Sequence, residues 1–302
     1  MNKIYIVLQA YSHRNYVNEA LYLIFSYIRN HKNWLSNEVA FVIYTDLAEE
    51  FAILQKYTDI FFIESINQSQ IIDWHGEPAF LHRGKIKMIE DFFQKYEGHL
   101  LYMDTDTYFL KESSEIFEKI RAKRNLMHTA EGKISSKKNP IFNKIYKFIK
   151  NQHFTISTGK TIKIPTETIM WNAGVIGLHH SKKYLIQEIL ELCDVMYKKY
   201  DKHVMEQLSF SYILENDNFI EASDAYIFHY WDFKEFRKTL KEFFDFYSDT
   251  DLLTMAEKSW QIMPQKLIAD RAIYYQKLPS WKKFVEVKIK RKEWQAPSVK
   301  LI

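Results

Sequence analysis

The feature that most restricts the fold of this chain is a regular alternation between short apolar runs and segments in which apolar residues recur at helical spacing. Runs of about four to eight apolar residues indicate strands, and a recurrence every three or four positions indicates amphipathic helices. The predicted strands cover residues 3–10, 39–44, 60–63, 100–103 and 174–178. The predicted helices cover residues 17–28, 47–57, 86–96 and 181–196. This alternation predicts an α/β fold with a mixed, mostly parallel sheet flanked by helices.

Composition excludes several classes of protein. The chain has 302 residues, of which 47% are hydrophobic, while only 7 are Gly and 6 are Pro, so it is neither disordered nor collagen-like. Its 42 Lys and Arg residues exceed its 38 Asp and Glu residues by four. This net charge of +4 is too small for a dedicated nucleic-acid-binding protein, and we expect no nucleic-acid partner.

The sequence predicts a protein of the cytoplasm. Its single cysteine, Cys193, lies among apolar residues, excludes an internal disulfide and suits a reducing compartment. The N-terminal apolar run lacks the features of a secretion signal and has no small-residue cleavage site after it. No stretch approaches the roughly 20 apolar residues that span a bilayer.

The chain divides into a predicted catalytic domain, residues 1–235, and a helical C-terminal extension, residues 236–302. Within the first part, residues 132–166 contain eight Lys and no Asp or Glu, and we interpret them as a basic insertion over the acceptor site. The extension contains Lys and Arg interleaved with aromatic residues over 281–292. Such a segment suits peripheral contact with anionic lipid headgroups, although ordinary solvated helix faces are the simpler explanation.

A pair of carboxylates follows the predicted strand 100–103 directly. Asp104 and Asp106, separated by Thr105, leave the carboxyl end of this strand, which is the edge where open α/β sheets bind ligands. Carboxylates at positions i and i+2 suit a hard divalent cation such as Mg²⁺ or Mn²⁺, which in turn can hold a diphosphate. A strand-end Asp also commonly caps a turn, so this motif by itself leaves both interpretations open.

One histidine stands in a similar position. His229 ends the apolar run 225–228, and a neutral imidazole is a good ligand for Mn²⁺ beside two carboxylates. A lone histidine is more often a core or interface residue, but its place at a strand end favours a ligand. Asp104, Asp106 and His229 are therefore the predicted metal site.

These features resemble glycosyltransferase family 8, the family of glycogenin and the lipopolysaccharide galactosyltransferases. The likeness rests on the Asp-Thr-Asp strand end, on Trp-Asn-Ala-Gly-Val-Ile-Gly at 171–177 and on His-Tyr-Trp at 229–231. The resemblance covers residues 3–235. Tyr16 and Lys87 also match residues of the family and occur in the same order along the chain. The resemblance implies a GT-A fold, the Rossmann-like fold of nucleotide-diphospho-sugar transferases. It also implies a UDP-sugar donor, Mn²⁺ or Mg²⁺, a glycan or lipid-linked acceptor in polysaccharide biosynthesis, and retention of anomeric configuration.

The same resemblance assigns roles to further residues. Lys87, with Arg83 and Lys85 as neighbours, would neutralise the charge that develops on the departing diphosphate. Tyr16 would lie beside the nucleotide base. Tyr11 and Asp46 follow the first two predicted strands at the same edge of the sheet, so the residues expected to contact the donor are Tyr11, Tyr16, Asp46, Arg83, Lys87, Thr105 and Lys234. Those expected at the reacting sugar are Asn172, Glu206 and Gln207.

The chain departs from the family pattern after His229. The family has a Gly three residues later and then Lys-Pro-Trp, whereas this chain has Asp232 and then Lys-Glu-Phe at 234–236. Lys234 is thus only a nearby substitute for the phosphate-binding lysine, and the chain also fits a sister family. An inverting enzyme would need a carboxylate base, for which the candidates are Glu131, Glu206 and Asp224.

Two other functions compete with this interpretation. Asp104 and Asp106 also match the opening motif of haloacid-dehalogenase-like phosphatases, as nucleophile and general acid or base. That motif normally lies on the first strand of its domain, whereas three predicted strands precede it here, and no later pair of acids completes the site. A GT-A-like protein that binds nucleotides without turnover is the non-enzymatic alternative, because a fold does not fix a function.

Overall fold

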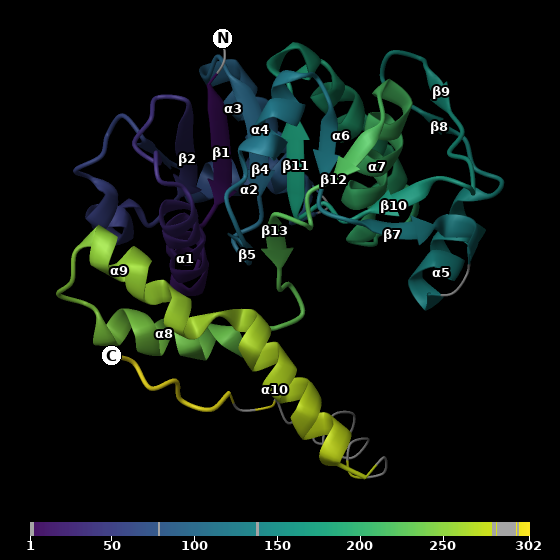
Figure 1. The fold of residues 1–302 in the computed structure, drawn as a ribbon. Helices are drawn as coiled ribbons and strands as arrows, with labels where there is room; N and C mark the ends of the chain where they lie inside the picture. The colour runs from purple at the N-terminus through teal and green to yellow at the C-terminus, as the bar shows by residue number, and fades with distance from the viewer. Residues whose placement is uncertain (1–2, 78, 137–138, 280–281, 283–293, 295) are drawn as a thin grey trace.

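The computed structural model describes residues 3–302 except 78, 137–138, 280–281, 283–293 and 295. A seven-stranded sheet forms its centre, in the order β12-β6-β11-β4-β1-β2-β3 (Figure 1). The strands are β1 (Ile4–Gln9), β2 (Val39–Thr45), β3 (Phe61–Ser65), β4 (His99–Met103), β5 (Thr107–Phe109), β6 (Asn125–Met127), β7 (Ala130–Lys133), β8 (Phe154–Thr155), β9 (Thr161–Ile162), β10 (Ile169–Trp171), β11 (Val175–Leu178), β12 (Ile220–Ala222) and β13 (Ile227–His229).

Helices connect and flank these strands (Figure 1). The α-helices are α1 (Arg14–Asn30), α2 (Gln68–His75), α3 (Arg83–Lys95), α4 (Ser114–Arg121), α5 (Pro140–Ile149), α6 (Leu185–Lys199), α7 (Val204–Asp217), α8 (Phe236–Phe246), α9 (Leu252–Lys258) and α10 (Pro264–Lys277). Shorter 3-10 helices are η1 (Ala48–Leu54), η2 (Ile134–Ser136), η3 (His180–Lys182) and η4 (Ser259–Ile262).

The central sheet is mixed and mostly parallel, which confirms the predicted fold class. β4, β1, β2 and β3 run parallel to one another. β11 lies antiparallel to both β4 and β6, and β12 is parallel to β6, so β11 runs against the other described strands of this sheet. From β3 the chain returns to the far side of β1 to form β4. Such a reversal of strand order opens a crevice at the carboxyl ends of the strands.

A separate pair of strands brings a distant part of the chain to that edge. Three residues separate the end of β4 from the start of β5, which pairs antiparallel with β13. In this register His229 lies opposite Thr107, and the Tyr230 amide donates a hydrogen bond to the Asp106 carbonyl over 3.0 Å. Backbone hydrogen bonds therefore fix the end of β13 beside the residues that follow β4.

Helices cover both faces of the central sheet. Ile6 and Leu8 of β1 belong to the apolar core shared with α1, α8 and α9, whereas Val7 belongs to the core shared with α3, α6 and α7. The inner strands are apolar on both faces, and β2 is buried along its whole length. This two-sided burial explains why these strands occur in the sequence as continuous apolar runs.

The predicted elements are present, with some differences at their ends. The strands predicted at 3–10, 39–44, 60–63, 100–103 and 174–178 are β1, β2, β3, β4 and β11. The helix predicted over 47–57 is wrong in type, because it is the 3-10 helix η1, in which Phe51 (φ −98°, ψ 16°) departs from helical geometry. The three-residue strands β5, β6, β10 and β12 were not predicted, since so few residues show no periodicity.

Part of the basic insertion packs as a wall beside the carboxyl edge of the sheet. Asn139 caps α5 by accepting a hydrogen bond from the Ile141 amide, and Pro140 occupies the first turn. Phe142, Ile145 and Ile149 bury one face of this helix. β7 pairs antiparallel with β10, which joins the start of the insertion to the segment just beyond its end.

The helices after residue 235 share the core of the sheet region. α8 and α9 pack on α1 within one apolar cluster. The boundary predicted at residue 235 thus falls after the last strand. It does not separate two independently packed cores. Most of the predicted basic and aromatic tail, Trp281 and residues 283–292, lies outside the described residues. In the part of the chain that the structure describes, no helix has the length and apolar character needed to cross a bilayer.

A buried ion pair connects α8 to α1. Glu19 is 1% exposed, and Arg237 donates to both of its carboxylate oxygens, over 2.8 and 3.3 Å. Burial raises the pKa of Glu19, and the Arg237 guanidinium opposes that rise. The C-terminal extension therefore supplies the counter-charge for a carboxylate that is buried in the core shared with α1, α8 and α9.

We expect Arg237→Ala to lower the free energy of unfolding by about 3 kcal/mol, because it leaves a buried carboxylate without a counter-charge. Urea unfolding followed by circular dichroism measures this loss. Arg14→Ala is the matched control, since the Arg14 side chain is 70% exposed in its pair with Glu50. Such surface pairs contribute at most about 1 kcal/mol. Equal losses in the two variants would contradict the role of the buried pair.

Candidate active site

Three side chains converge at the carboxyl edge of the sheet. Asp104 and Asp106 follow β4, and His229 ends β13. One ligand atom from each lies within 4.8 Å of the other two, with His229 Nε2 at 3.1 Å from Asp106 Oδ1 and 3.9 Å from Asp104 Oδ2. Two neighbouring ligands at about 2.1 Å from an octahedral cation lie about 3 Å apart. The donor atoms and their spacing therefore fit one divalent cation.

The hydrogen bonds around His229 prepare its Nε2 as a metal ligand. The Gly174 amide donates to Asn172 Oδ1 over 3.0 Å, which is consistent with that atom being the amide oxygen. His229 Nδ1 lies 3.0 Å from the same oxygen and must carry a proton to donate to it. Nε2 is then left to face Asp106. This arrangement is favourable with a cation between the two side chains.

Gly174 permits the close approach of the imidazole. The Asp104 amide donates to the Gly174 carbonyl over 2.8 Å, which continues the pairing of β4 with β11. A Cβ at position 174 would lie 2.3 Å from His229 Cε1 and 2.4 Å from Nδ1. Any side chain at this position would therefore displace the His229 ring from its place beside Asn172.

A buried lysine, Lys85, lies between the carboxylates of Asp104 and Glu206. Lys85 Nζ is 3.2 Å from Asp104 Oδ1 and 3.2 Å from Glu206 Oε1, and it donates to the Ala173 carbonyl over 3.0 Å. Burial opposes its charge, but the two carboxylates outweigh burial and raise the pKa of Lys85. Burial also raises the pKa of Glu206, against the effect of Lys85. This pairing occupies Asp104 Oδ1 and leaves Oδ2 on the side of His229.

Lys234 pairs with the other carboxylate of the cluster. Its Nζ donates to Asp106 Oδ2 over 2.6 Å, while Oδ1 of the same side chain faces His229. Burial raises the pKa of Asp106, but hydrogen bonds and charges from His229 and Lys234 outweigh it and hold that pKa well below its usual range. Asp106 is therefore ionised at neutral pH, as a metal ligand must be.

Thr105 turns away from the two carboxylates that flank it. Its hydroxyl donates to Glu19 Oε2 over 3.2 Å, and Glu19 is the carboxylate that Arg237 holds. Thr105 lines a cavity beside the cluster, but its hydroxyl is bound to the protein. The side chain thus fixes the turn that presents Asp104 and Asp106.

Two cavities meet at the cluster. The smaller, of about 290 Å³, lies between the ends of β1 and β4. The larger, of about 640 Å³, is bounded by the insertion, the β10–β11 connection, α7 and the residues after β13. Four side chains line both cavities, namely His82, Lys85, Asp104 and Asp106. A cation at the cluster would therefore lie between the two compartments.

The structure brings most of the predicted site residues to these cavities. Tyr11 and Tyr16 line the smaller cavity, and Asn172, Glu206, Gln207, His229 and Lys234 line the larger. The other predicted donor residues have partners elsewhere. The Asp46 carboxylate accepts from the Ser12 amide, Arg83 pairs with Asp194, and Lys87 pairs with Glu90. Asp46, Arg83 and Lys87 are not among the residues that line these two cavities.

The helical phase of α3 explains why Lys85, and not Lys87, lies at the site. Lys85 shares the buried face of this helix with Ile89 and Phe92, whereas Lys87 shares the opposite face with Glu90. Lysines are rarely buried on the apolar face of a helix, so the sequence analysis, which assigned the role to Lys87, did not anticipate the place of Lys85. The cavity wall also includes Glu131, which the sequence analysis considered only as a base for an inverting reaction, and His82 and His203, which it did not single out.

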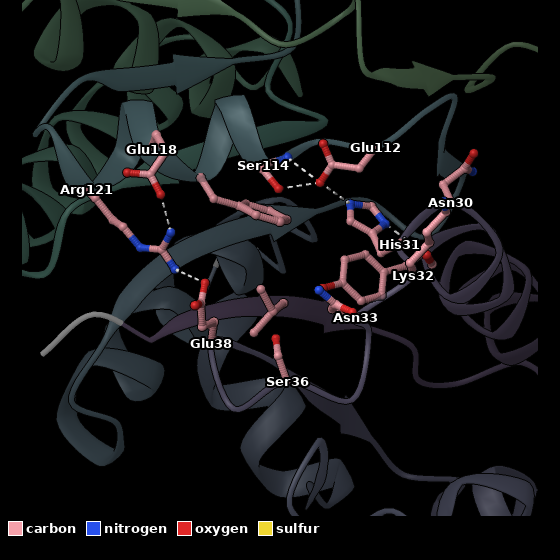
Figure 2. A pocket seen from close by; sticks show the side chains of 13 residues that line it. Asn30, His31, Lys32, Asn33, Ser36, Glu38, Glu112, Ser114, Glu118 and Arg121 are labelled. Atoms are coloured by element: carbon pink, nitrogen blue, oxygen red, sulfur yellow. Dashed lines mark hydrogen bonds and ion pairs between the residues drawn. The ribbon is translucent and has the colours of Figure 1, made fainter.

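A further cavity, of about 470 Å³, lies at the opposite edge of the sheet, where β2 begins (Figure 2). Several of its charged groups pair with one another, as Arg121 does with Glu38 and Glu118. His31 is bound at both ring nitrogens, by the Tyr27 carbonyl and by Ser113. Arg121, Glu38, Glu118 and His31 are thus committed to the fold, and the Asp104, Asp106 and His229 cluster does not line this cavity.

The sequence matches no protein-family model and no curated protein. The chain is similar to the apo form of mouse Xyloside xylosyltransferase 1, with 13% identity and a TM-score of 0.46 over 72% of this chain and 84% of that one. It is also similar to the galactosyltransferase LgtC in complex with donor and acceptor sugar analogs, with 12% identity and a TM-score of 0.46 over 69% and 70% of the two chains.

A third similar structure is the apo glycosyltransferase GlyE of Streptococcus pneumoniae TIGR4, with 12% identity and a TM-score of 0.43. The match covers 73% of this chain but only 45% of GlyE, so the chain spans less than half the length of that protein. All these likenesses are distant, and the function of this chain has to rest on the chemistry of its own site.

We expect Gly174→Ala to weaken Mn²⁺ binding by about 10- to 100-fold, because the added methyl group displaces the His229 ring from its orienting hydrogen bond. Electron paramagnetic resonance of free Mn²⁺ measures the affinity. Asp106→Asn, which removes a ligand directly, provides the reference for full loss of the site. The melting temperature without metal separates loss of the site from loss of the fold, and a Gly174→Ala variant with wild-type affinity would exclude His229 as a ligand.

Proposed function

We propose that this protein is a metal-dependent glycosyltransferase that moves a sugar from a nucleoside-diphosphate donor, a UDP-sugar, to a hydroxyl group of a glycan or lipid-linked acceptor. The observation that carries the proposal is the position of the Asp104, Asp106 and His229 cluster at the junction of the two cavities. A nucleotide sugar has the same order of parts, with a nucleoside at one end, a charged diphosphate in the middle and a sugar at the other end.

The smaller cavity suits the nucleoside. Tyr11 and Tyr16 line it, and the Arg237 guanidinium carbon lies 4.9 Å from the centre of the Tyr16 ring. Aromatic rings stack on any base, so the choice of uracil rests on the family resemblance. The larger cavity suits the sugar, because amide and carboxyl groups there can bind hydroxyls. These groups belong to Asn172, Glu206 and Gln207.

In the proposed reaction the bond between the anomeric carbon and the β-phosphate oxygen breaks, and a bond from that carbon to the acceptor oxygen forms. The acceptor hydroxyl gives its proton to the leaving phosphate. A divalent cation, Mn²⁺ or Mg²⁺, held by Asp104, Asp106 and His229 would supply positive charge for the diphosphate. Lys85 and Lys234 add fixed positive charge on two sides of the cluster. We thus assign to Lys85 the role that the resemblance gives to Lys87.

Retention of anomeric configuration is part of the proposal and rests on the resemblance. Two of the candidate bases for an inverting reaction, Glu131 and Glu206, line the larger cavity, whereas Asp224 is not among its lining residues. The phosphatase alternative lacks support at the site, because no further Asp or Glu of the described chain joins the cluster. A cytoplasmic location, suited to the buried thiol of Cys193, completes the proposal.

The first test is ligand-dependent thermal stability. We expect UDP with Mn²⁺ to raise the melting temperature of the wild type, since a ligand of the folded state stabilises it by mass action. EDTA should abolish the shift, and so should Asp106→Ala, which removes a ligand of the cation. No shift with any nucleoside diphosphate in the presence of Mn²⁺ or Mg²⁺ would overturn the proposal. Binding without turnover of any UDP-sugar, even to water, would favour the non-enzymatic alternative.

A pair of substitutions on α3 tests the assignment of the lysine. Lys85→Met removes the ammonium beside Asp104, and we expect turnover of the UDP-sugar to fall by about 100-fold or more, the scale of lost electrostatic stabilisation. Lys87→Met, two residues away on the polar face, should change turnover less than about twofold because Lys87 pairs with Glu90. Initial rates of UDP release provide the comparison. The opposite ranking would restore the role that the resemblance gives to Lys87.

A further inference from the structure

The larger cavity extends beyond the residues assigned to the donor sugar. Its volume of about 640 Å³ is more than twice the 290 Å³ of the cavity beside the nucleoside. Its lining also includes Ile141 and Phe142 of α5 and Trp231. None of these three side chains carries a charge, and none takes part in the proposed donor site. This part of the cavity is therefore available to a second molecule.

Trp231 is held outward by its neighbours. Tyr230 and Phe233 are buried in the core, and the Phe233 amide donates to the Tyr230 carbonyl over 2.8 Å in a tight turn. Trp231, between them, is 59% exposed and lines the cavity. Most of the described tryptophans are buried, with exposures below 10% at Trp34, Trp74, Trp171 and Trp294. Covering such an apolar ring removes apolar surface from water, which contributes favourable free energy to the binding of a ligand.

Glu131 stands on β7 in the same cavity and already contacts two residues of the donor site. Its Oε1 accepts from Asn172 Nδ2 over 3.2 Å, and its Oε2 accepts from Gln207 Nε2 over 2.8 Å. A carboxylate can accept about four hydrogen bonds, so each oxygen retains a site for a further donor. Glu131 is exposed, and the two amides fix its orientation. It is thus a preoriented acceptor for hydroxyl protons next to the reacting sugar.

We propose that Trp231 and Glu131 form the binding site for the acceptor, and that the acceptor presents an uncharged sugar ring to it. The proposal rests on the glycosyltransferase function proposed above. A pyranose ring has apolar C–H faces and a rim of hydroxyl groups, so it stacks on an indole ring and donates hydrogen bonds to a carboxylate. An anionic group at the same place would be repelled by Glu131. Glu131 binds and positions the acceptor hydroxyl close to the donor sugar.

The test measures saccharide binding separately from donor binding. The probes are methyl glycosides of glucose, galactose and N-acetylglucosamine, offered to the protein with UDP and Mg²⁺. Saturation-transfer difference NMR should detect one or more of them on the wild type, with the strongest transfer to the protons of one ring face. Trp231→Ala should reduce this signal at least fivefold, whereas Trp231→Phe, which retains an aromatic face, should keep part of it.

Two controls match the substitutions by type and exposure. Trp260 is 55% exposed on η4 and is not among the residues that line the cavity, so Trp260→Ala should keep the wild-type signal. Glu131→Gln should reduce binding of the same glycoside severalfold, since an amide loses half of the acceptor capacity. Glu167→Gln, at an exposed carboxylate that pairs with Lys133, should not reduce it. Melting temperatures verify that each variant is folded.

The outcomes separate this inference from the function on which it rests. If the wild type shows no thermal shift with UDP and a divalent cation, the proposed function fails, and the acceptor site fails with it. If that shift is present, two results would overturn the acceptor site alone. One is the absence of saturation transfer to any of the glycosides, and the other is an equal signal from Trp231→Ala and Trp260→Ala.

Discussion

The whole candidate site depends on one close contact, between the backbone of Gly174 and the imidazole of His229. The two residues belong to segments that sheet pairing brings together, because β11 pairs with β4 and β13 pairs with β5. Asn172 then orients the ring, and Asp104 and Asp106 face its Nε2. A Cβ at position 174 would overlap the His229 ring, so the ring or the backbone beside it would have to shift.

Charge compensation is the second requirement of the site. Asp104, Asp106, Glu206 and Glu19 lie close together, and burying several carboxylates is costly unless each has a partner. Lys85 serves Asp104 and Glu206, Lys234 serves Asp106, and Arg237 serves Glu19. Arg237 comes from the C-terminal extension and also lies over the Tyr16 ring. The extension is therefore part of the site's support, in addition to covering α1.

The arrangement of the two cavities links this local chemistry to the proposed reaction. The reversal of strand order beside β1 creates the smaller cavity, and the insertion with α7 encloses the larger one. The metal cluster stands between them because Asp104 and Asp106 leave β4 at the centre of the sheet. The end of β4 thus places the Asp104, Asp106 and His229 cluster at the boundary between the two cavities, which the proposed function assigns to the nucleoside and to the sugars.

The sequence by itself determined the α/β class, the main strands and the two carboxylates and histidine of the cluster, because apolar runs and strand-end positions are local features. It did not determine that Lys85 rather than Lys87 faces Asp104, since two residues on a helix differ only in direction, and packing sets that direction. Only the tertiary structure joined Arg237 to Glu19 and placed Glu131 and Trp231 in one cavity. Those contacts connect residues about 100 or more positions apart in the sequence. They depend on sheet register and helix packing, which no local sequence pattern encodes.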